Sequence, residues 1–232
     1  MTRFIFFDLD DTLYDQLKPF RDALITVMPE LERRGIVMER LFQKVRHYSD
    51  RLWDRYCEGK LTLAEVRSGR IIRAFEEFGV DVDETRALQI QADYEREQTR
   101  IRPFPELESC FSVLKSRGFH IGVITNGPVE HQLNKLKTLN LSGQFERDRV
   151  FVSDAIGIAK PNPELFRSVN ERTGTSAEHC YHIGDSWIND IEASYRAGWH
   201  SIWLNNRERM PESGIQPWAV IQNHKELIDL LI

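Results

Sequence analysis

The sequence predicts an α/β fold: a Rossmann-like core, in which a parallel sheet is covered by helices on both faces, with an all-helical cap domain inserted into it. Two observations lead to this prediction. Short apolar runs alternate with helical stretches over most of the chain, a pattern typical of parallel strands joined by right-handed crossovers. One block, from about Lys18 to Thr99, has only helical patterns. Because this block follows the first strand, we expect it to be an insertion into the sheet domain.

The first strand is expected at Phe4–Phe7, because an uninterrupted apolar run is typical of a strand buried on both faces. Five further strands are expected at 120–124, 150–153, 180–183, 201–204 and 219–221. Helices are expected over 128–139, from about residue 163, over 188–197 and over 225–232. Strands and helices therefore alternate through the second half of the chain.

The inserted block is expected to contain at least three helices. One apolar stripe recurs at spacings of three and four residues, at Leu41, Val45, Tyr48, Leu52 and Tyr56. Thr62 and Glu65 have the spacing of a capping box, which opens a second helix. Asp83 can cap a further helix that extends to Gln98. These patterns favour helix over strand throughout the block.

The predicted domain boundaries follow from these elements. We assign residues 17–99 to the helical cap, and residues 1–16 together with 100–232 to the α/β core. The segment Arg102–Pro105 contains two prolines and is expected to be the linker by which the chain returns to the sheet.

Composition and charge narrow the class of protein. The 232 residues are 41% hydrophobic and carry a net charge of −5, which gives no support to a nucleic-acid or anionic-membrane partner. No apolar run approaches the length of a membrane-spanning helix, and the N-terminus lacks a signal-peptide pattern. The three cysteines are widely spaced, which suits a reducing compartment. We therefore expect a cytoplasmic protein; its oligomeric state is left open.

Polar residues follow four of the predicted strands or strand–loop units. They are Asp8 with Asp10, Thr125 with Asn126, Lys160, and Asp185 with Asp190. The carboxyl ends of parallel strands share one edge of a sheet, so these groups are expected to converge. Carboxylates a few ångströms apart repel by about 4 kcal/mol at an effective dielectric constant near 20. A hard divalent cation is the usual compensation for such a cluster.

These segments read Asp-Leu-Asp-Asp-Thr-Leu, Ile-Thr-Asn, Lys-Pro and Gly-Asp-Ser-Trp-Ile-Asn-Asp. In this order they resemble the four motifs of the haloacid dehalogenase superfamily, and the position of the helical block resembles that of a type-1 cap. The resemblance covers the whole chain and is strongest to the phosphatase and nucleotidase branch. It implies a Mg²⁺-dependent phosphatase that acts on a small phosphorylated metabolite.

The resemblance also implies a role for each motif residue. Asp8 would be the nucleophile that forms an aspartyl-phosphate, and Asp10 the general acid and then the base. Thr125, the backbone around Asn126 and the ammonium of Lys160 would bind the phosphoryl oxygens.

A magnesium site is implied at the same sheet edge. Mg²⁺ would be bound by the side chains of Asp8 and Asp185 and by the backbone carbonyl of Asp10. Asp190 would not bind the ion directly; it would orient water on the metal or the side chain of Lys160.

Each of these residues also has a purely structural interpretation. Lys160, before a proline, would ordinarily be an exposed loop lysine, and Asp190 could be an acid in the first turn of a helix. For Asp11 we favour a simple turn after the first strand. Cys180 and the two histidines near it, His179 and His182, are expected to be buried in a strand rather than to bind a metal.

Four other functions remain as alternatives. A 2-haloacid dehalogenase of the same superfamily attacks carbon without a metal and typically lacks the acid equivalent to Asp10. A sugar-phosphate mutase would keep the same site, although such relatives usually have glycine where this chain has Asp11. Phosphonate cleavage would need a lysine of the cap, and no pattern selects one. A phosphoaspartate signalling domain has a similar set of residues, but its phosphorylated Asp ends a later strand.

Among phosphatase substrates, pyrimidine nucleoside 5′-monophosphates are favoured by the Asp-Asp-Thr-Leu pattern; sugar phosphates and phosphoglycolate stay open.

Overall fold

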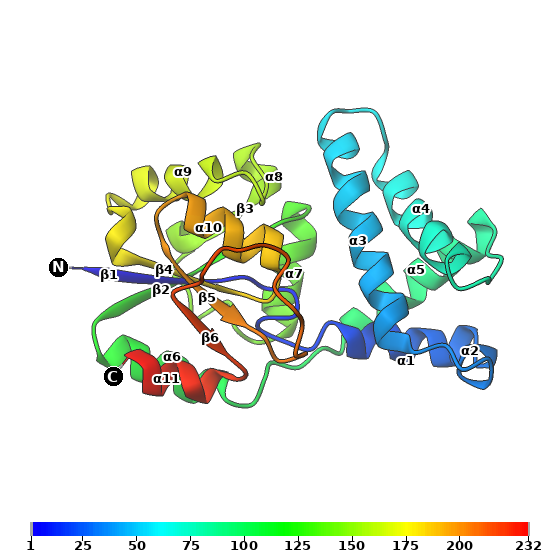
Figure 1. Cartoon of the computed structure of the whole chain (residues 1–232), viewed down its shortest axis with the longest axis horizontal. Helices are drawn as coiled ribbons and strands as arrows, with labels where there is room; N and C mark the ends of the chain where they lie inside the picture. The colour runs from blue at the N-terminus through cyan, green and yellow to red at the C-terminus, as the bar shows by residue number, and fades with distance from the viewer. Residues whose placement is uncertain (1, 232) are drawn as a thin grey trace. The chain divides into compact units, whose positions relative to one another are not determined.

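The structure, a computed structural model, describes residues 2–231 and divides into two compact units (Figure 1). One unit combines the chain up to Asp15 with the chain from Arg102 onward and contains the sheet. The other unit is Gln16–Ile101 and contains helices only among its regular elements. Each unit has a hydrophobic core of its own.

The sheet unit contains a six-stranded parallel sheet in the order β3-β2-β1-β4-β5-β6. The strands are β1 Arg3–Phe7, β2 Phe119–Thr125, β3 Val150–Val152, β4 Cys180–Gly184, β5 His200–Leu204 and β6 Ala219–Ile221. The direction of the chain's path along the sheet reverses at β1, whose neighbours are β2 and β4. Such a reversal is where open α/β sheets bind ligands. The predicted fold class is confirmed.

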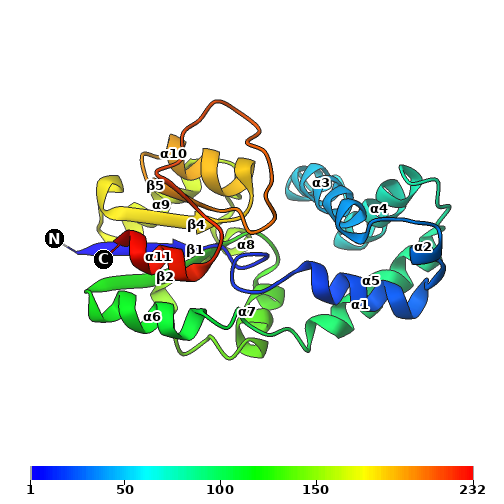
Figure 2. The ribbon, with the colours of Figure 1, turned by 60° about the horizontal axis from the view of Figure 1, so that its bottom comes forward.

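Helices cover both faces of this sheet, as Figure 2 shows. On one face, α6 (Leu107–Ser116) and α7 (Val129–Thr138) follow each other, and the ring of Phe111 contacts Phe7 of β1. On the other face, α9 (Glu164–Thr173) and α10 (Ala193–Arg196) pack on β1 through an apolar cluster. That cluster includes Phe4, Phe6, Ile124, Phe166 and Trp199. The alternate residues of β1 thus fill two separate apolar layers.

The structure corrects two of the predicted elements and adds a helix that was not predicted. The predicted strand 150–153 ends at Val152, because Ser153 begins the short helix α8 (Ser153–Ile156). The predicted helix 188–197 is a π-helical turn, η3 (Trp187–Glu192), followed by α10. Helix α6 was not expected from the sequence pattern. The last predicted helix is α11 (His224–Leu231), which packs beside α6; Ile232 lies outside the described residues. Two short 3₁₀ turns, at Arg147–Arg149 and Ala177–His179, complete the unit.

The helical unit consists of α1 Leu17–Val27, α2 Glu30–Arg33, α3 Met38–Cys57, α4 Leu63–Glu76 and α5 Glu84–Gln98. The predicted capping box is confirmed: Thr62 and Glu65 hydrogen-bond reciprocally at the start of α4. Asp83 accepts a hydrogen bond from the backbone of Arg86 at the start of α5, as expected of an N-cap. The buried positions of α3, such as Leu41 and Val45, pack into one core with α1, α4 and α5.

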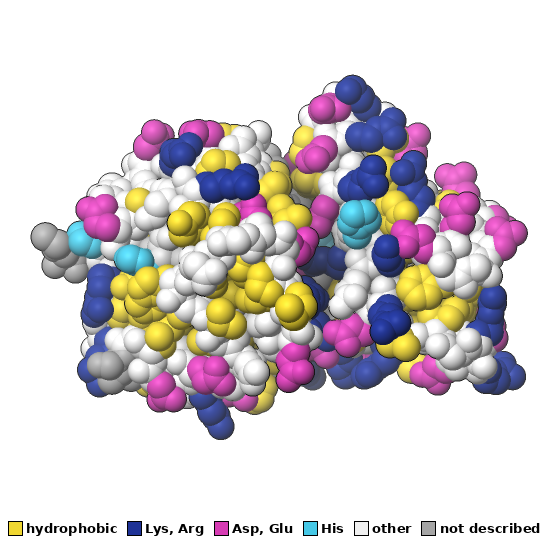
Figure 3. Space-filling view, in the orientation of Figure 1, with side chains coloured by type: hydrophobic (Ala, Val, Ile, Leu, Met, Phe, Trp, Pro, Cys, Tyr) yellow, Lys and Arg dark blue, Asp and Glu magenta, His cyan; other side chains and the backbone are white. Residues whose placement is uncertain are grey.

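Apolar side chains are exposed where the sheet ends at β6. Trp218, Val220 and Leu230 are all at least 39% exposed, and Figure 3 shows hydrophobic side chains gathered over the region of β6 and α11. None of the described helices is long and apolar enough to cross a membrane. The sheet edge at β6 therefore carries apolar surface, whereas the acidic motif residues follow the central strands β1 and β4.

Candidate active site

The register of the sheet brings three motif residues together. Phe7 pairs with Val123 of β2 and with Ile183 of β4, so the three strands end at nearly the same level. Asp8 directly follows β1, and its backbone N–H donates to the carbonyl of Ile183 over 2.8 Å. Thr125 is the last residue of β2, and Asp185 directly follows β4. The predicted convergence at the strand ends is thus a consequence of parallel pairing.

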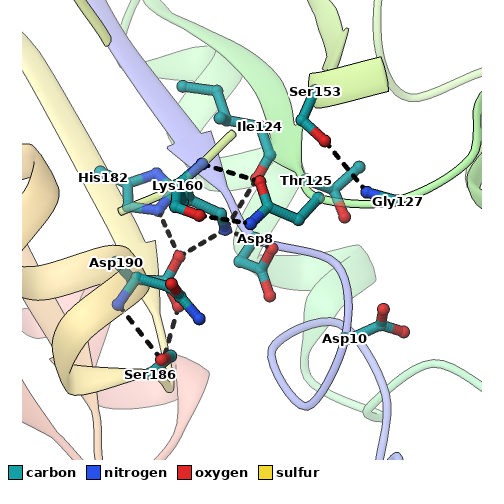
Figure 4. A network of polar contacts seen from close by, with 12 residues as sticks. Asp8, Asp10, Ile124, Thr125, Gly127, Ser153, Lys160, His182, Ser186 and Asp190 are labelled. Carbon is teal, nitrogen blue, oxygen red and sulfur yellow. Dashed lines mark hydrogen bonds and ion pairs between the residues drawn. The ribbon is translucent and has the colours of Figure 1, made fainter. Parts of the chain in front are cut away.

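Lys160 lies at the centre of the polar contacts around Asp8 (Figure 4). Its Nζ is 2.7 Å from Oδ1 of Asp8 and 2.6 Å from Oδ1 of Asp190. The same nitrogen is 3.3 Å from the carbonyl oxygen of Ile124. Lys160 is only 5% exposed, so the loop-lysine interpretation is wrong. We call Asp8, Lys160, His182 and Asp190 the Lys160 cluster.

Asp190 has hydrogen-bond donors on both of its carboxylate oxygens. Oδ1 contacts Lys160 and Nε2 of His182, and Oδ2 accepts from the backbone N–H of Ser186 over 3.0 Å. The π-helical turn η3 carries Asp190 toward the sheet, and Gly184 leaves the space for it. A Cβ at Gly184 would lie 2.2 Å from Cγ of Asp190. Asp190 is therefore a buried partner of Lys160 and not a surface acid at a helix start.

The pKa values in the cluster follow from burial and charge. Burial raises the pKa of Asp8 to about 7, with the Lys160 ammonium opposing the rise and the Asp190 and Asp10 carboxylates adding to it. Burial would also raise the pKa of Asp190, but Lys160 and His182 outweigh it and hold that pKa below its usual range. Burial lowers the pKa of His182, so this imidazole is neutral at pH 7. An ionised Asp190 only accepts hydrogen bonds; therefore Nε2–H of His182 donates to it.

The sequence predicted that Cys180, His179 and His182 would be buried in a strand. Cys180 and His182 are fully buried in β4. For His179 the prediction was wrong, because this residue lies half-buried in the 3₁₀ turn before β4. The contact of His182 with Asp190 was not predicted. Its sequence signal is weak, because a histidine in an apolar strand is compatible with simple packing. Only the position of Asp190 within η3 shows why the ring is oriented toward the site.

Asn126 links the second motif to the third. Its Nδ2 donates to the carbonyl of Lys160 over 2.8 Å, and its Oδ1 accepts from the backbone N–H of Lys160 over 2.9 Å. Two hydrogen bonds between one side chain and one backbone residue fix the loop that carries Lys160. The backbone N–H of Gly127 donates to the hydroxyl of Ser153 over 3.1 Å, which ties the loop after β2 to the residue that directly follows β3.

Asp10 lies on the loop after β1, apart from the Lys160 cluster (Figure 4). Its carboxylate pairs with Lys135 of α7, whose Nζ is 2.7 Å from Oδ1 and 2.8 Å from Oδ2. The hydroxyl of Tyr14 also donates to Asp10, and Nε2 of Gln132 is 3.4 Å from Oδ2. Gln132 donates to the hydroxyl of Thr125 as well. Neither Lys135 nor Gln132 was predicted from the sequence, because both belong to an ordinary amphipathic helix.

Asp11 has a left-handed backbone with φ of 63°, as expected of a tight turn, yet its side chain is 1% exposed. Arg207 binds it through two hydrogen bonds of 2.7 and 2.6 Å, and also contacts Asp15 over 2.8 Å. Arg209 reaches Oδ2 of Asp185 over 3.0 Å. The favoured turn interpretation of Asp11 thus omitted an ion pair, and neither arginine was predicted, because the loop after β5 has no motif.

The carboxylates of the site fit a hard cation. One oxygen each of Asp8, Asp185 and Asp190 lie within 4.8 Å of one another, and all three residues are buried. Oxygen donors of this kind suit Mg²⁺ or Ca²⁺ rather than softer metals. Asp190 already accepts from Lys160, His182 and Ser186. Asp8 and Asp185 are therefore the side chains better placed to bind an ion.

Comparison with known proteins adds the family. A family model for haloacid dehalogenase-like hydrolases matches residues 2–198. The chain belongs to this family. Among curated relatives of this haloacid dehalogenase-like hydrolase, a glyceraldehyde 3-phosphate phosphatase of Methanothermobacter thermautotrophicus is 28% identical over 100% of both chains. A pyrimidine 5′-nucleotidase of Escherichia coli is 28% identical over 98% of this chain and 96% of its own. The predicted family is confirmed.

Solved structures of the same fold include proteins with different activities. The crystal structure of a protein described as a HAD-hydrolase, YfnB from Bacillus subtilis, bound to magnesium, matches with a TM-score of 0.74 at 29% identity. That match covers 99% of this chain and 98% of YfnB. An L-2-haloacid dehalogenase from Xanthobacter autotrophicus matches with a TM-score of 0.76 at 20% identity, over 100% and 98% of the two chains. At that identity the second match establishes the shared fold alone.

Proposed function

We propose that this hydrolase cleaves small phosphate monoesters through a covalent intermediate on Asp8. The contact that carries the proposal is the 2.7 Å ion pair between Asp8 and Lys160 at the end of β1. It places a buried carboxylate beside a buried cation, in the family of hydrolases to which the chain belongs. The phosphatase and nucleotidase relatives that match over nearly the whole chain support phosphorus as the centre attacked.

The proposed reaction has two steps. In the first, an oxygen of Asp8 attacks phosphorus, the bond from phosphorus to the ester oxygen breaks, and Asp10 gives its proton to the leaving alkoxide. In the second, Asp10 takes a proton from water, which attacks phosphorus, and the bond from phosphorus to Asp8 breaks. Inorganic phosphate is released and Asp8 is regenerated. Lys160, Thr125 and the backbone at Asn126 would bind the phosphoryl oxygens as their charge redistributes.

A bound Mg²⁺ is part of the proposal. The side chains of Asp8 and Asp185 would hold it together with the backbone carbonyl of Asp10, and Asp190 would orient Lys160. When bound, the ion neutralises charge on the phosphoryl group and aligns it for in-line displacement. Asp8 attacks as the carboxylate, so a cation beside it also offsets the burial that raises its pKa to about 7.

The substrate is proposed to be a small phosphorylated metabolite, with nucleoside 5′-monophosphates first among the candidates. The pyrimidine 5′-nucleotidases of Escherichia coli and Streptococcus pneumoniae, at 28% and 26% identity, support this order. The presence of Asp10 favours phosphatase over dehalogenase chemistry, because an alkoxide leaving group needs a proton whereas a halide does not.

The proposal is tested by the rate of phosphate release with Asp8→Asn. We expect this variant to lose turnover by about 10⁴-fold or more, since the amide is not a nucleophile, while its melting temperature shows a folded protein. Asp148→Asn, a change of the same type at an exposed position, should keep the wild-type rate. The assay should cover nucleoside monophosphates and sugar phosphates, with and without Mg²⁺. Turnover by Asp8→Asn at the wild-type rate would refute the covalent scheme.

A further inference from the structure

Helix α7 carries a second buried lysine that the proposed chemistry does not use. Lys135 is 5% exposed, and its ammonium faces both carboxylate oxygens of Asp10, at 2.7 and 2.8 Å. The two residues are 125 positions apart in the chain. A charge-assisted contact to both oxygens at once restricts rotation of the carboxylate more than a single hydrogen bond does. Lys135 therefore fixes the direction in which Asp10 points.

The same face of α7 also contacts the second motif. Gln132, one turn before Lys135, is 1% exposed and donates to the hydroxyl of Thr125. Its Nε2 also lies 3.4 Å from Oδ2 of Asp10. Residues three apart on a helix share a face, so one rigid element contacts both Asp10 and Thr125. The orientation of the proposed acid is thereby tied to the proposed phosphoryl-binding threonine.

The two acids of the first motif are consequently held by different lysines. Asp8 pairs with Lys160 and Asp10 pairs with Lys135. Tyr14 donates a further hydrogen bond to Asp10 from the same loop. Without Lys135, the carboxylate of Asp10 would lose the ammonium that contacts both of its oxygens and could rotate about its side-chain torsions. A displacement of about 1 Å in a reacting group can cost about 100-fold in rate.

We propose that Lys135 is a positioning residue, which holds the carboxyl group of Asp10 in line with the leaving-group oxygen of a phosphoryl group bound near Thr125. This inference rests on the proposed function, because it takes Asp10 as the acid. It predicts a defect that depends on the leaving group. A poor leaving group such as an alkoxide needs the proton of a well-placed acid, whereas a nitrophenolate departs with little help.

The test is steady-state kinetics of Lys135→Met on two esters, p-nitrophenyl phosphate and a nucleoside 5′-monophosphate. We expect kcat/KM, which covers the steps up to cleavage of the ester bond, to fall about 10- to 100-fold on the nucleotide and less than about 3-fold on the aryl ester. The value of kcat also includes hydrolysis of the intermediate, in which Asp10 acts as the base for both esters, so kcat is not the quantity that separates them. Asp10→Asn should show the same pattern with a larger loss on the nucleotide. Lys137→Met, at an exposed position of the same helix, should match the wild type on both esters.

The possible outcomes distinguish a failure of the proposal for Lys135 from a failure of the proposed phosphatase function. An equal loss of kcat/KM on both esters by Lys135→Met, while Asp10→Asn distinguishes them, would show that Lys135 only supports the fold and would overturn the inference. A wild type inactive on both esters would overturn the proposed function and this inference together. If Lys135→Met does not fold, Lys135→Gln retains one possible hydrogen bond to Asp10. Lys135→Gln should then show the same selective loss on the nucleotide. If that selective loss is absent, the proposal is contradicted.

Discussion

The two buried lysines of the sheet unit hold acids in different ways. Lys160 is shared between two carboxylates, those of Asp8 and Asp190. Lys135 contacts both oxygens of one carboxylate, that of Asp10. Around Lys160 the acids outnumber the lysine, and Asp185 lies in the same group of carboxylates. The described ion pair of Lys135 joins it to one carboxylate, that of Asp10.

This difference suggests two different roles: the carboxylates around Lys160 would bind a metal ion, whereas Lys135 would orient the carboxylate of Asp10. A buried cluster with more carboxylates than lysines favours an additional cation, which is where Mg²⁺ is proposed to bind. The ion pair of Lys135 with Asp10 does not favour an additional cation, and its contribution is to orient the carboxylate of Asp10. The comparison therefore predicts that changes near Lys160 affect catalysis, stability and metal affinity together. Changes near Lys135 should affect mainly one step of the reaction.

The largest effect is expected from Lys160→Met. The change leaves Asp8 and Asp190 buried without their shared ammonium, which should lower the free energy of unfolding by about 3–5 kcal/mol. Loss of a cation that stabilises the phosphoryl group should lower kcat by about 10²- to 10⁴-fold. Urea denaturation and kinetics on both esters measure the two quantities. The comparison fails if Lys135→Met lowers kcat on the aryl ester by as large a factor as Lys160→Met does.

A smaller effect is expected from Gly184→Ala, which tests whether Asp190 acts through Lys160. The new Cβ would lie 2.2 Å from Cγ of Asp190, so the carboxylate must move away from Lys160 and His182. We expect a loss of about 1–3 kcal/mol of stability from the overpacking and a fall in kcat of about 10-fold or more, with KM nearly unchanged.

Gly143→Ala is the matched control for this change, because its Cβ would meet no atom within 4 Å. It should leave both stability and kcat close to those of the wild type. If Gly184→Ala proves as active as Gly143→Ala, the position of Asp190 does not matter to the reaction.

The smallest expected effect is the pH dependence of Mg²⁺ binding. Burial raises the pKa of Asp8 to about 7, so in the metal-free protein this ligand is protonated below pH 7 and ionised above it. Mg²⁺ competes with that proton; hence its apparent affinity should fall about tenfold between pH 8 and pH 6, or about 1.4 kcal/mol. Isothermal titration calorimetry measures it directly. Asp8→Asn should abolish this dependence, and an unchanged dependence would assign it to another group.

Much of the fold could be predicted from local patterns, and so could the acids of the site that directly follow a strand. The strands were found because continuous apolar runs are rare outside buried strands. Asp8 and Asp185 were found because they directly follow such runs. The π-helical turn was not predicted, since its residues have the composition of an ordinary helix. Its extra residue per turn is stabilised by the contacts that Asp190 makes after folding.

Lys135 and Lys137 show where the sequence stops being informative. They lie two residues apart on one amphipathic helix, yet one is buried against Asp10 and the other is exposed. No local pattern separates them, because the rotation of α7 against the sheet decides which side points inward. Arg207 and Arg209 are similar, since their partners Asp11 and Asp185 come from distant segments.

The order of amino acids is enough to specify the parallel sheet, its two helical layers and the acids that follow β1 and β4, because hydrophobic periodicity and strand ends are local properties. The pairing of each acid with its cation is not specified in this way. That assignment depends on the register of the strands and the rotation of the helices, both of which arise from long-range packing. For this reason the contacts of Asp8 and Asp10 with two different lysines become visible only in the folded chain.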